Sequence, residues 1–382
     1  MKSLFSRYTV SIVAFSLFSL FSSHTLAAVP AAPKLAAKAY VLMDFSSKNI
    51  VAELDGDAPV EPASLTKMMT AYIIFHELDA GNIRLTDNVQ ISKKAWKMQG
   101  SRMFIEVNSS VTVDELIRGI IIQSGNDATV AMAEHIAGSE DAFVSLMNNY
   151  AKELGMNHTH FMNSTGLPHK NHYTTARDLA ILAHAIIRDH SQHYSLYSEK
   201  EYTYNGIRQY NRNKLLWQDK YVDGIKTGHT ESAGYCLASS AKRGDMRLIA
   251  VVLGTNSENA RATESQKLLT YGFRFFETHK LYGASQELAS TRIWKGASES
   301  LPLGLAKDMY ITIPRGRYKS LKASMSIDRK IIAPASKGSV YGTVNINLGD
   351  QKVAEADLVA LENIAPAGFA AALMDEVKLL FE

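Results

Sequence analysis

A long apolar helix is predicted to begin in the segment Pro62-Ala-Ser-Leu-Thr-Lys-Met-Met-Thr70 and to cover residues 64–79. The run is apolar on most sides, which is typical of a helix buried at the centre of a domain. Ser64 and Lys67 are three residues apart, so their side chains lie on one helical face, one turn apart. Backbone N–H groups at a helix start point at an incoming oxyanion. A lysine of lowered pKa can take the proton of the serine, so the pair is a candidate nucleophile and base.

A second motif, Ser124-Gly-Asn126, lies in the predicted apolar helix 112–136. The helix breaks there and presents a hydroxyl and a carboxamide; the structural alternative is an N-cap for the following helix. Each motif is weak alone. Ser-x-x-Lys recurs at Ser239, which we interpret as chance, and Ser-x-Asn recurs twice elsewhere.

The third motif, Lys226-Thr-Gly228, occurs once. It lies on a strand predicted over 221–228, followed by strands over 235–241 and 248–253 that share a hairpin turn at 242–245. Adjacent residues of a strand point to opposite faces, so Lys226 and Thr227 point apart. A glycine at position 228 permits close approach of a ligand or a neighbouring strand.

The order and spacing of the three motifs form a joint signal for penicillin-recognising serine enzymes. With Val222-Asp-Gly-Ile-Lys-Thr-Gly-His-Thr230 and Ile313-Pro-Arg-Gly316, the chain resembles the D-alanyl-D-alanine carboxypeptidases, the low-molecular-mass penicillin-binding proteins, over nearly its whole length. It looks closest to the Gram-negative type with a C-terminal β-domain.

The resemblance implies an α+β fold: a serine β-lactamase/transpeptidase-like catalytic domain, with an antiparallel sheet flanked by helices, plus a small all-β domain. It implies that Ser64 attacks the bond between the last two D-alanines of a peptidoglycan stem peptide, that Lys67 is the base and that Ser124 relays a proton. Lys226 is expected to lower the pKa of Lys67 as a second ammonium. The other residues expected to bind the substrate are Asn126, Lys226, Thr227, Gly228, His229 and Arg212. β-Lactam antibiotics are expected to acylate Ser64; no cofactor or metal is expected.

Composition limits the class of protein. The chain has 382 residues, of which 46% are hydrophobic and 21% charged, which excludes a disordered chain, a collagen-like fibre and a polytopic membrane protein. It has 41 basic and 38 acidic residues but no run of five like charges, so nucleic acid is not an expected partner. Its one cysteine, Cys236, lies in an apolar run and is interpreted as a buried structural thiol.

Four segments are predicted along the chain. Residues 1–27 are a signal peptide, with Lys2 and Arg7 before a short apolar stretch and small residues at the cleavage site; the alternative is an uncleaved anchor. The catalytic domain covers 28–284 and includes a hairpin over 38–54 and a helix over 260–281. A β-sandwich covers 285–365. Export implies an oxidising compartment, and the resemblance to the Gram-negative type implies the periplasm, at the outer face of the inner membrane.

Residues 366–382 form the fourth segment, an amphipathic helix with Phe369, Leu373, Met374, Val377, Leu380 and Phe381 on one side. It is too short to span a bilayer, and the resemblance implies peripheral membrane contact. Its polar face carries a net charge of −2, whereas interfacial helices usually have basic faces. The alternative is a helix docked on its own β-domain.

Two other patterns are interpreted as non-catalytic. The Glu153…Asn157 pair superficially matches the deacylating glutamate of class A β-lactamases, but it ends a helix. His158, His160, His169 and His172 lack zinc-ligand spacing and predict a surface or cleft loop. The alternatives for function are a β-lactamase with fast deacylation, an endopeptidase acting on D-alanyl cross-links and a catalytically quiet peptidoglycan-binding protein.

Overall fold

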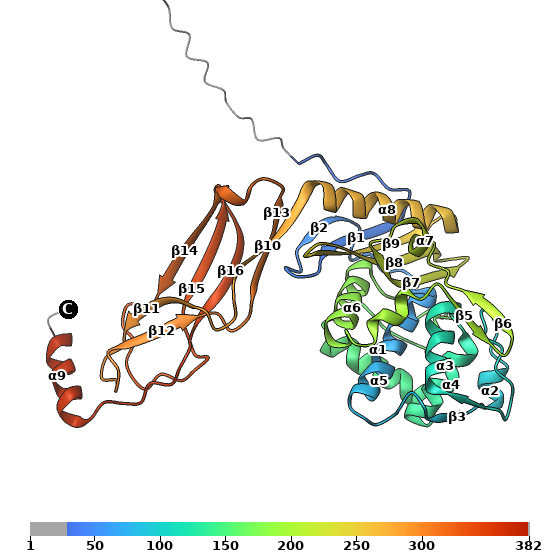
Figure 1. The fold of residues 1–382 in the computed structure, drawn as a ribbon, viewed down its shortest axis with the longest axis horizontal. Coiled ribbons are helices and arrows are strands. Elements are labelled where there is room, and N and C mark those ends of the chain that lie inside the picture. The colour runs from blue at the N-terminus through green and yellow to red at the C-terminus, as the bar shows by residue number, and fades with distance from the viewer. Residues whose placement is uncertain (1–28, 381–382) are drawn as a thin grey trace, which may run out of the picture. The chain divides into compact units, whose positions relative to one another are not determined.

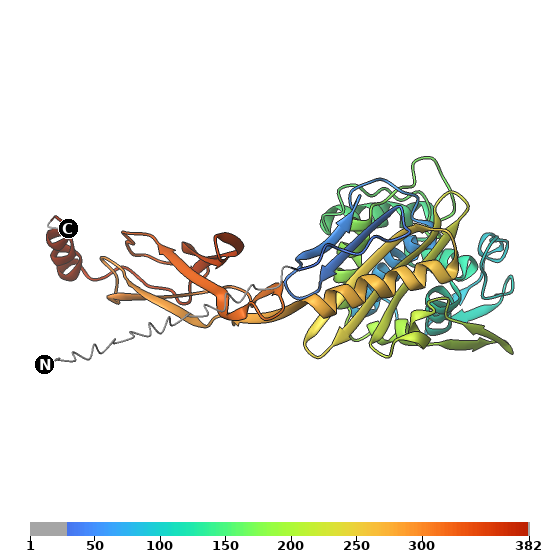
Figure 2. The same ribbon diagram turned by 90° about the horizontal axis from the view of Figure 1, so that it is seen from above.

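The computed structural model describes residues 29–380 (Figures 1 and 2). The predicted signal peptide and Phe381 therefore lie outside the described residues. Between residues 29 and 380, no helix is long and apolar enough to cross a membrane.

The first domain is built on a five-stranded antiparallel sheet of order β2-β1-β9-β8-β7. Both predicted hairpins are confirmed, because β1 pairs with β2 and β8 pairs with β9. The strand β1 also pairs with β9, Tyr40 opposite Val252, so the N-terminal hairpin and the late strands form one sheet. The strands are β1 (Ala39–Asp44), β2 (Ile50–Leu54), β7 (Val222–Thr230), β8 (Gly234–Arg243) and β9 (Met246–Thr255).

Helices cover both faces of this sheet. Helix α8 (Glu258–Phe275) packs against β8 and β9 and lies along one face (Figure 2), whereas α6 (Ala176–Asp189) packs on β1 and β9 from the other. Five more helices lie on the side of α6 (Figure 1). They are α1 (Lys67–Asp79), α2 (Lys93–Trp96), α3 (Val113–Arg118), α4 (Asn126–Ala137) and α5 (Glu140–Glu153). Short elements complete this part: β3 (Asn88–Gln90), β4 (Ser110–Thr112), β5 (Glu201–Tyr204), β6 (Ile207–Tyr210) and α7 (Leu215–Gln218).

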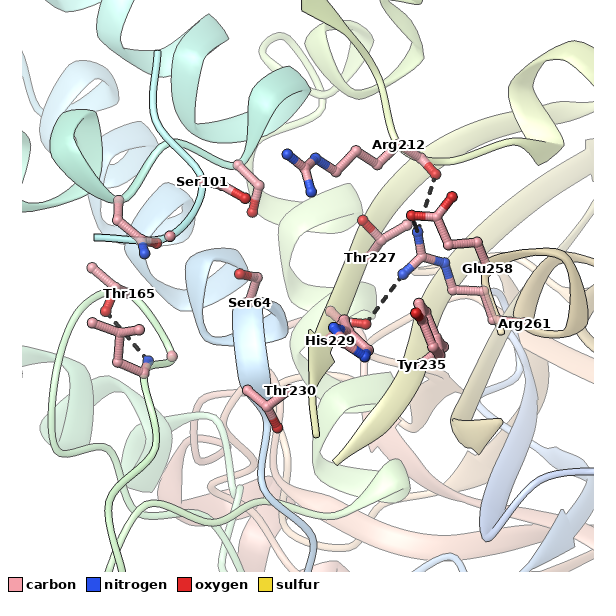
Figure 3. Close-up of a pocket in the computed structure, with 16 residues that line it drawn as sticks. Ser64, Ser101, Thr165, Arg212, Thr227, His229, Thr230, Tyr235, Glu258 and Arg261 are labelled. Atoms are coloured by element: carbon pink, nitrogen blue, oxygen red, sulfur yellow. Dashed lines mark hydrogen bonds and ion pairs between the residues drawn. The ribbon is translucent and has the colours of Figure 1, made fainter. Parts of the chain in front are cut away.

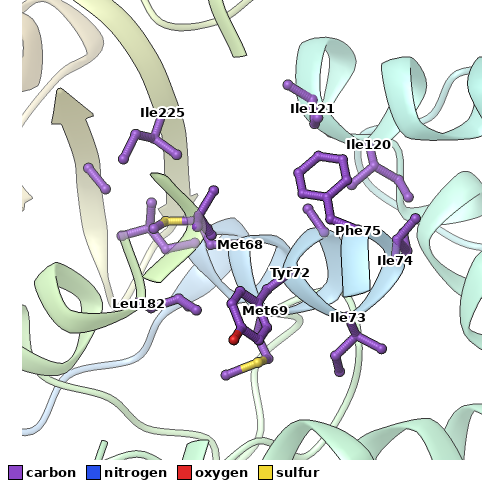
Figure 4. Close-up of a cluster of buried hydrophobic side chains, with 14 of the residues drawn as sticks. Met68, Met69, Tyr72, Ile73, Ile74, Phe75, Ile120, Ile121, Leu182 and Ile225 are labelled. Carbon is purple, nitrogen blue, oxygen red and sulfur yellow. The ribbon is translucent and has the colours of Figure 1, made fainter. Parts of the chain in front are cut away.

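Helix α1 is the central helix that the sequence predicts. Every residue from Lys67 to Phe75 is buried, and apolar side chains surround the helix on all sides (Figure 4). The α-helix begins at Lys67, later than predicted, because a single 3₁₀ turn, Ala63–Thr66, precedes it. Burial on every side holds α1 rigidly in the domain, so the backbone that carries Lys67 has a fixed position away from water.

The predicted helix 112–136 is divided. Thr112 and Glu115 form a capping box at the start of α3, and a π-helical turn, Gly119–Gln123, follows. The chain then turns sharply before α4 begins at Asn126. π-Helical turns are frequent at functional sites because they re-aim the residues that follow.

The second domain is built of strands, with a 3₁₀ turn at Tyr318–Ser320. The predicted helix 260–281 is wrong in its last turn: α8 ends at Phe275, and β10 (Phe276–Tyr282) pairs with β13 (Met309–Pro314). A five-stranded sheet has the order β11-β12-β16-β15-β14. Its strands are β11 (Glu287–Arg292), β12 (Ser300–Gly304), β14 (Leu321–Ile327), β15 (Val340–Leu348) and β16 (Gln351–Ala360). Ile311 and Ile313 of β13 share one buried cluster with Val344, Ile346 and Leu358, so the two sheets pack together. Helix α9 (Phe369–Leu379) follows, as predicted.

Candidate active site

The candidate nucleophile, Ser64, lies in the 3₁₀ turn directly before α1. Ala63 has the unusual φ of +47°, and Leu65 donates its N–H to the carbonyl of Pro62 at 3.1 Å. This tight turn leaves Ser64 partly exposed while both neighbours are buried. Ser64 lines a cavity of about 240 Å³, so its hydroxyl is accessible to a substrate.

Lys67 lies beneath Ser64, with its side chain 1% exposed. Its Nζ is 3.1 Å from Ser64 Oγ, 2.7 Å from Asn126 Oδ1 and 2.6 Å from the carbonyl oxygen of Thr165. A neutral amine has two N–H bonds and one lone pair. When the two carbonyl oxygens accept those N–H bonds, the lone pair points at Ser64 Oγ, as a general base requires.

The pKa of Lys67 is lowered to about 7. Burial is the largest cause, and the charge of Arg212 adds to it, whereas Asp127 opposes it. The neighbouring cation that lowers the pKa of Lys67 is Arg212, where the sequence led us to expect Lys226. Lys226 is itself 3% exposed, and burial together with Lys67, Arg212 and Arg261 holds its pKa well below the ordinary value. Repulsion between the buried amines of Lys67 and Lys226 disfavours protonation of both at once. The exposed guanidinium of Arg212 therefore supplies the constant positive charge beside them.

Ser124 follows the π-helical turn and adopts the left-handed conformation, with φ 65° and ψ 35°. The N–H of Gly125 bonds back to the Gly119 carbonyl at 2.9 Å and fixes this turn. The Ser124 hydroxyl is buried and has no hydrogen-bond partner among residues 29–380. Buried hydroxyls are normally paired, so an unpartnered one facing a cavity is available to a substrate.

Asn126 has a role that its motif did not predict. Its Oδ1 accepts from Lys67, and its Nδ2 donates to the carbonyl of Gln99 at 2.6 Å. Its backbone N–H bonds the carbonyl of Ser101 at 2.7 Å. The carboxamide therefore orients the candidate base as well as lining the cavity.

Strand β7 forms the opposite wall of the cavity. Gly228 lies against the nucleophile turn: a Cβ there would be 3.2 Å from the Pro62 carbonyl and 3.3 Å from Ala63. The close approach is therefore to the turn that carries Ser64, and not to a neighbouring strand. Thr227 and His229 line the cavity, whereas Lys226, like Lys67, lies buried behind its wall.

Two arginines make the far end of the cavity positive. Arg212 extends above Ser64 towards Ser101 (Figure 3). Arg261, from α8, is 3% exposed and donates to the carbonyls of Gly228 at 3.2 Å and Arg212 at 3.4 Å. Its guanidinium also lies 5.6 Å from the ring of Tyr235. This end of the cavity suits a carboxylate.

Comparison with known proteins agrees with this geometry. A family model described as D-alanyl-D-alanine carboxypeptidase matches residues 26–257, and one described as penicillin-binding protein 5, C-terminal domain, matches residues 276–366. The chain belongs to the D-alanyl-D-alanine carboxypeptidase family. It is a serine hydrolase, and the predicted α+β fold with a separate all-β domain is confirmed.

Relatives of this carboxypeptidase chain match it along most of its length. It is 47% identical to D-alanyl-D-alanine carboxypeptidase DacA of Escherichia coli, over 92% of this chain and 90% of that protein. It is 43% identical to DacA of Haemophilus influenzae, over 96% and 94%. Penicillin-binding protein 5 of Haemophilus influenzae superposes with a TM-score of 0.86 at 44% identity, covering 88% of this chain and 99% of that structure.

The patterns interpreted as non-catalytic lie outside the carboxypeptidase cavity. Glu153 is exposed at the end of α5. His158 and His169 are exposed; His172 also lies in the loop but is buried, with its Nε2 3.1 Å from Thr66 Oγ1, so the predicted surface position is wrong for this histidine. Cys236 is buried as predicted, and burial raises the pKa of its thiol.

Sequence reasoning missed two contributors to the carboxypeptidase site. The Thr165 group that binds Lys67 is a backbone carbonyl, which any residue supplies, so no motif marks it. Arg261 carries a weak signal, namely a cation in the helix after the last strand of the sheet, but only the fold shows that its side chain turns inward.

Proposed function

We propose a division of roles for the removal of the terminal D-alanine from a peptidoglycan pentapeptide. Neutral Lys67 takes the proton of Ser64 as the Ser64 oxygen bonds to the penultimate D-alanine carbonyl carbon. The contacts of Lys67 with Asn126 and Thr165 support this role, because they direct its lone pair. The observation that carries the proposal is the position of the Lys67 amine, which contacts three oxygens. Its pKa is about 7, and its Nζ lies 3.1 Å from Ser64 Oγ.

The developing oxyanion is bound by the backbone N–H groups of Ser64 and His229. The close approach of Gly228 to the nucleophile turn supports this pairing, because it brings β7 alongside Ser64. Each such donor contributes about 3–4 kcal/mol in other enzymes. When the C–N bond breaks, the leaving amine takes a proton from the Lys67 ammonium by way of Ser124, whose hydroxyl is otherwise unpartnered within the described part of the chain.

The terminal carboxylate is bound by Thr227 and Arg212, which line the cavity. Lys226 lies buried behind the wall, where burial and neighbouring cations hold its pKa well below the ordinary value; a carboxylate in the cavity favours its protonation through charge, without direct contact. Water then attacks the acyl-enzyme ester and Lys67 accepts its proton; the bond from the acyl carbon to Ser64 Oγ breaks, Lys67 gives that proton to Ser64 Oγ, and the shortened peptide leaves as the acid. Penicillin acylates the same serine, because its lactam carbonyl presents similar atoms.

Slow loss of the penicillin adduct is expected. Among residues 29–380, no carboxylate takes the place of a deacylating glutamate beside Ser64, since Glu153 lies elsewhere and the carboxylate that lines the cavity, Glu258, is on the arginine side (Figure 3). This favours a carboxypeptidase over a β-lactamase. One relative, penicillin-binding protein D2 of Listeria monocytogenes, has a solved ampicillin-bound form with a TM-score of 0.59 at 27% identity, covering 64% of this chain and 100% of that one.

The test is release of free D-alanine from a pentapeptide, with Ser64→Ala as the control, followed by mass spectrometry of a penicillin adduct. Release of D-alanine together with an adduct lasting hours supports the proposal. Turnover of penicillin within seconds would indicate a β-lactamase. Absence of both reactions in folded protein would indicate a binding protein.

We also propose that the catalytic domain ends at Phe275 rather than at residue 284, because β10 pairs with β13, and that the β-sandwich therefore covers 276–365, followed by the C-terminal helical segment 366–382. The chain works in the periplasm at the outer face of the inner membrane. Five apolar side chains of the helical segment are more than half exposed, which supports peripheral contact: Phe369, Leu373, Met374, Val377 and Leu380. The acidic residues that give the polar face of this helix its negative charge are paired with the β-domain. Asp375 accepts from the Lys295 backbone N–H at 2.7 Å, and Glu376 pairs with the Lys295 side chain.

A further inference from the structure

The Thr165 carbonyl that holds Lys67 belongs to a turn whose peptide groups are fixed one by one. Asn163 Oδ1 accepts from the backbone N–H groups of Thr165 at 3.2 Å, Gly166 at 2.7 Å and Leu167 at 3.2 Å. Gly166 has φ +89°, and a Cβ there would be 1.8 Å from the Ala63 carbonyl oxygen. The turn therefore lies directly against the residue that precedes Ser64.

The residue before Thr165 is fixed from two other elements. Glu140, in the first turn of α5, accepts from the Ser164 N–H at 3.1 Å and from Ser164 Oγ at 2.7 Å. The Ser164 carbonyl accepts from Thr70 Oγ1 of α1 at 2.8 Å. The second Glu140 oxygen pairs with Lys94 of α2 at 2.8 Å.

These contacts give the carboxylate an unusual setting. Glu140 is 9% exposed and does not line the cavity, so it does not meet the substrate. Burial alone would raise the pKa of Glu140, but the bonds from Lys94 and Ser164 outweigh it and keep the group ionised. Hydrogen bonds to an ionised acceptor are shorter and stronger than neutral ones, so this anchor is rigid.

We propose that Glu140 is a positioning residue of the carboxypeptidase reaction, which acts through Ser164 and the Thr165 carbonyl on the direction of the Lys67 lone pair. The chain of contacts is continuous: Glu140 to Ser164, one peptide bond to Thr165, and 2.6 Å from its carbonyl to Lys67 Nζ. Displacement of a catalytic group by about 1 Å costs about 100-fold in rate. The inference rests on the proposed role of Lys67 as base.

Three variants separate positioning from folding. Glu140→Ala removes the acceptor of both Ser164 bonds. Glu140→Gln keeps an oxygen for Ser164 but loses the charge facing Lys94. Lys94→Ala is the matched control, because it removes the ion pair and leaves the Ser164 contacts in place. For each we would measure the acylation rate constant with a fluorescent penicillin between pH 5 and 9, corrected for folded protein by the final labelling stoichiometry.

We expect Glu140→Ala to slow acylation about 10- to 100-fold. The acidic limb of its pH–rate profile is expected to shift to lower pH. A displaced Thr165 carbonyl stabilises the Lys67 ammonium less, which lowers the pKa of Lys67, while Lys226, Arg212 and Asp127 stay in place around it. Glu140→Gln is expected to recover most of the rate, and Lys94→Ala to keep both rate and pH profile. Variants that lose thermal stability while keeping the wild-type rate and acidic limb would overturn the proposal.

Two further variants keep the test decisive. If Glu140→Ala does not fold, Thr70→Val withdraws the other support of Ser164 and is expected to shift rate and limb in the same direction; an unchanged limb would overturn the proposal. Lys67→Ala is measured alongside. Wild-type acylation in Lys67→Ala would overturn the proposed base, whereas an inactive Lys67→Ala beside a wild-type-like Glu140→Ala would overturn only the role of Glu140.

Discussion

At the scale of single residues, the site depends on how one amine is held. The spacing of Ser64 and Lys67 was enough to predict that they meet, because three residues of helix place both on one face. The two oxygens that complete the arrangement come from residues 59 and 98 positions away from Lys67. Local periodicity carries no information about such contacts, so they required the fold.

The depressed pKa of Lys67 predicts a pH dependence. Only the neutral amine accepts a proton, and a pKa of about 7 makes that form available near neutral pH. We expect acylation by penicillin to rise about tenfold per pH unit below pH 7 and to level off above it. Lys67→Ala is expected to lower the plateau by about 10²–10⁴-fold. Stopped-flow labelling measures both, and a rate that does not change between pH 5 and 7 would contradict the assignment.

A matched control comes from the second Ser-x-x-Lys, Ser239 to Lys242, on β8. Ser239 is fully buried and donates to the Ala250 carbonyl at 3.2 Å, so it is a structural residue. Lys242→Ala is expected to keep the wild-type acylation rate. Peptide mapping is expected to place the label on Ser64 alone, and a label on Ser239 would refute the choice of nucleophile.

The positive end of the cavity predicts selectivity for a free C-terminus. A charged hydrogen bond contributes about 1.5–3 kcal/mol, so amidation of the last D-alanine should lower kcat/KM at least about tenfold. Arg212→Ala should reduce this discrimination. Arg208→Ala is the control, because Arg208 is exposed, pairs with Glu201 at 2.5 Å and does not line the cavity. Equal rates on acid and amide would favour an endopeptidase.

At the scale of elements, the sequence predicted strands and buried helices well where the hydrophobic pattern continues over many residues. The sheet hairpins and the burial of α1 follow from alternation and from an all-round apolar run. The π-helical turn before Ser124 and the end of α8 at Phe275 were not predicted. Both lie inside segments whose sequence pattern predicts an uninterrupted helix. Packing of neighbouring elements outweighs local propensity at such points.

The contact between two elements, the 163–167 turn and the nucleophile turn, makes a prediction about glycine. Gly166→Ala is expected to destabilise the protein by more than Gly138→Ala, the matched control. Both glycines have positive φ, so both pay about 1–2 kcal/mol of backbone strain. At Gly138 nothing lies within 4 Å of the new Cβ, whereas at Gly166 it meets the Ala63 carbonyl.

Denaturant titration gives the two free energies of unfolding, and penicillin labelling gives the state of the site. Only Gly166→Ala is expected to slow acylation, because relief of the overlap must move Ala63 and with it Ser64. Equal losses of stability with equal labelling rates would show that the two turns are not in firm contact.

At the scale of the whole molecule, the C-terminal helix combines the two alternatives left open by its sequence. Its acidic residues are paired with the β-domain through Lys295, and Asp375 also lies 3.5 Å from Arg292. Its apolar residues remain exposed: Phe369 is 86% and Leu380 77% exposed. The charge of −2 counted from the sequence is therefore largely neutralised by residues more than 70 positions earlier, which a local count of charges does not include.

This arrangement predicts that the helix binds membranes through its apolar side rather than through charge. Each large apolar side chain contributes about 1.5–3 kcal/mol when fully buried, so a Phe369→Ser/Leu380→Ser variant should bind vesicles at least about tenfold more weakly. Binding of the wild type should persist in 0.5 M salt and differ little between zwitterionic and anionic vesicles, because no basic face attracts anionic lipid.

Lys378→Ala is the control on the same helix and should bind as the wild type does. Release of D-alanine from a dissolved pentapeptide should be unchanged in all three proteins, since the cavity is formed by residues 64–261. Vesicle binding that survives the double substitution, or that disappears in salt, would show that another surface makes the contact.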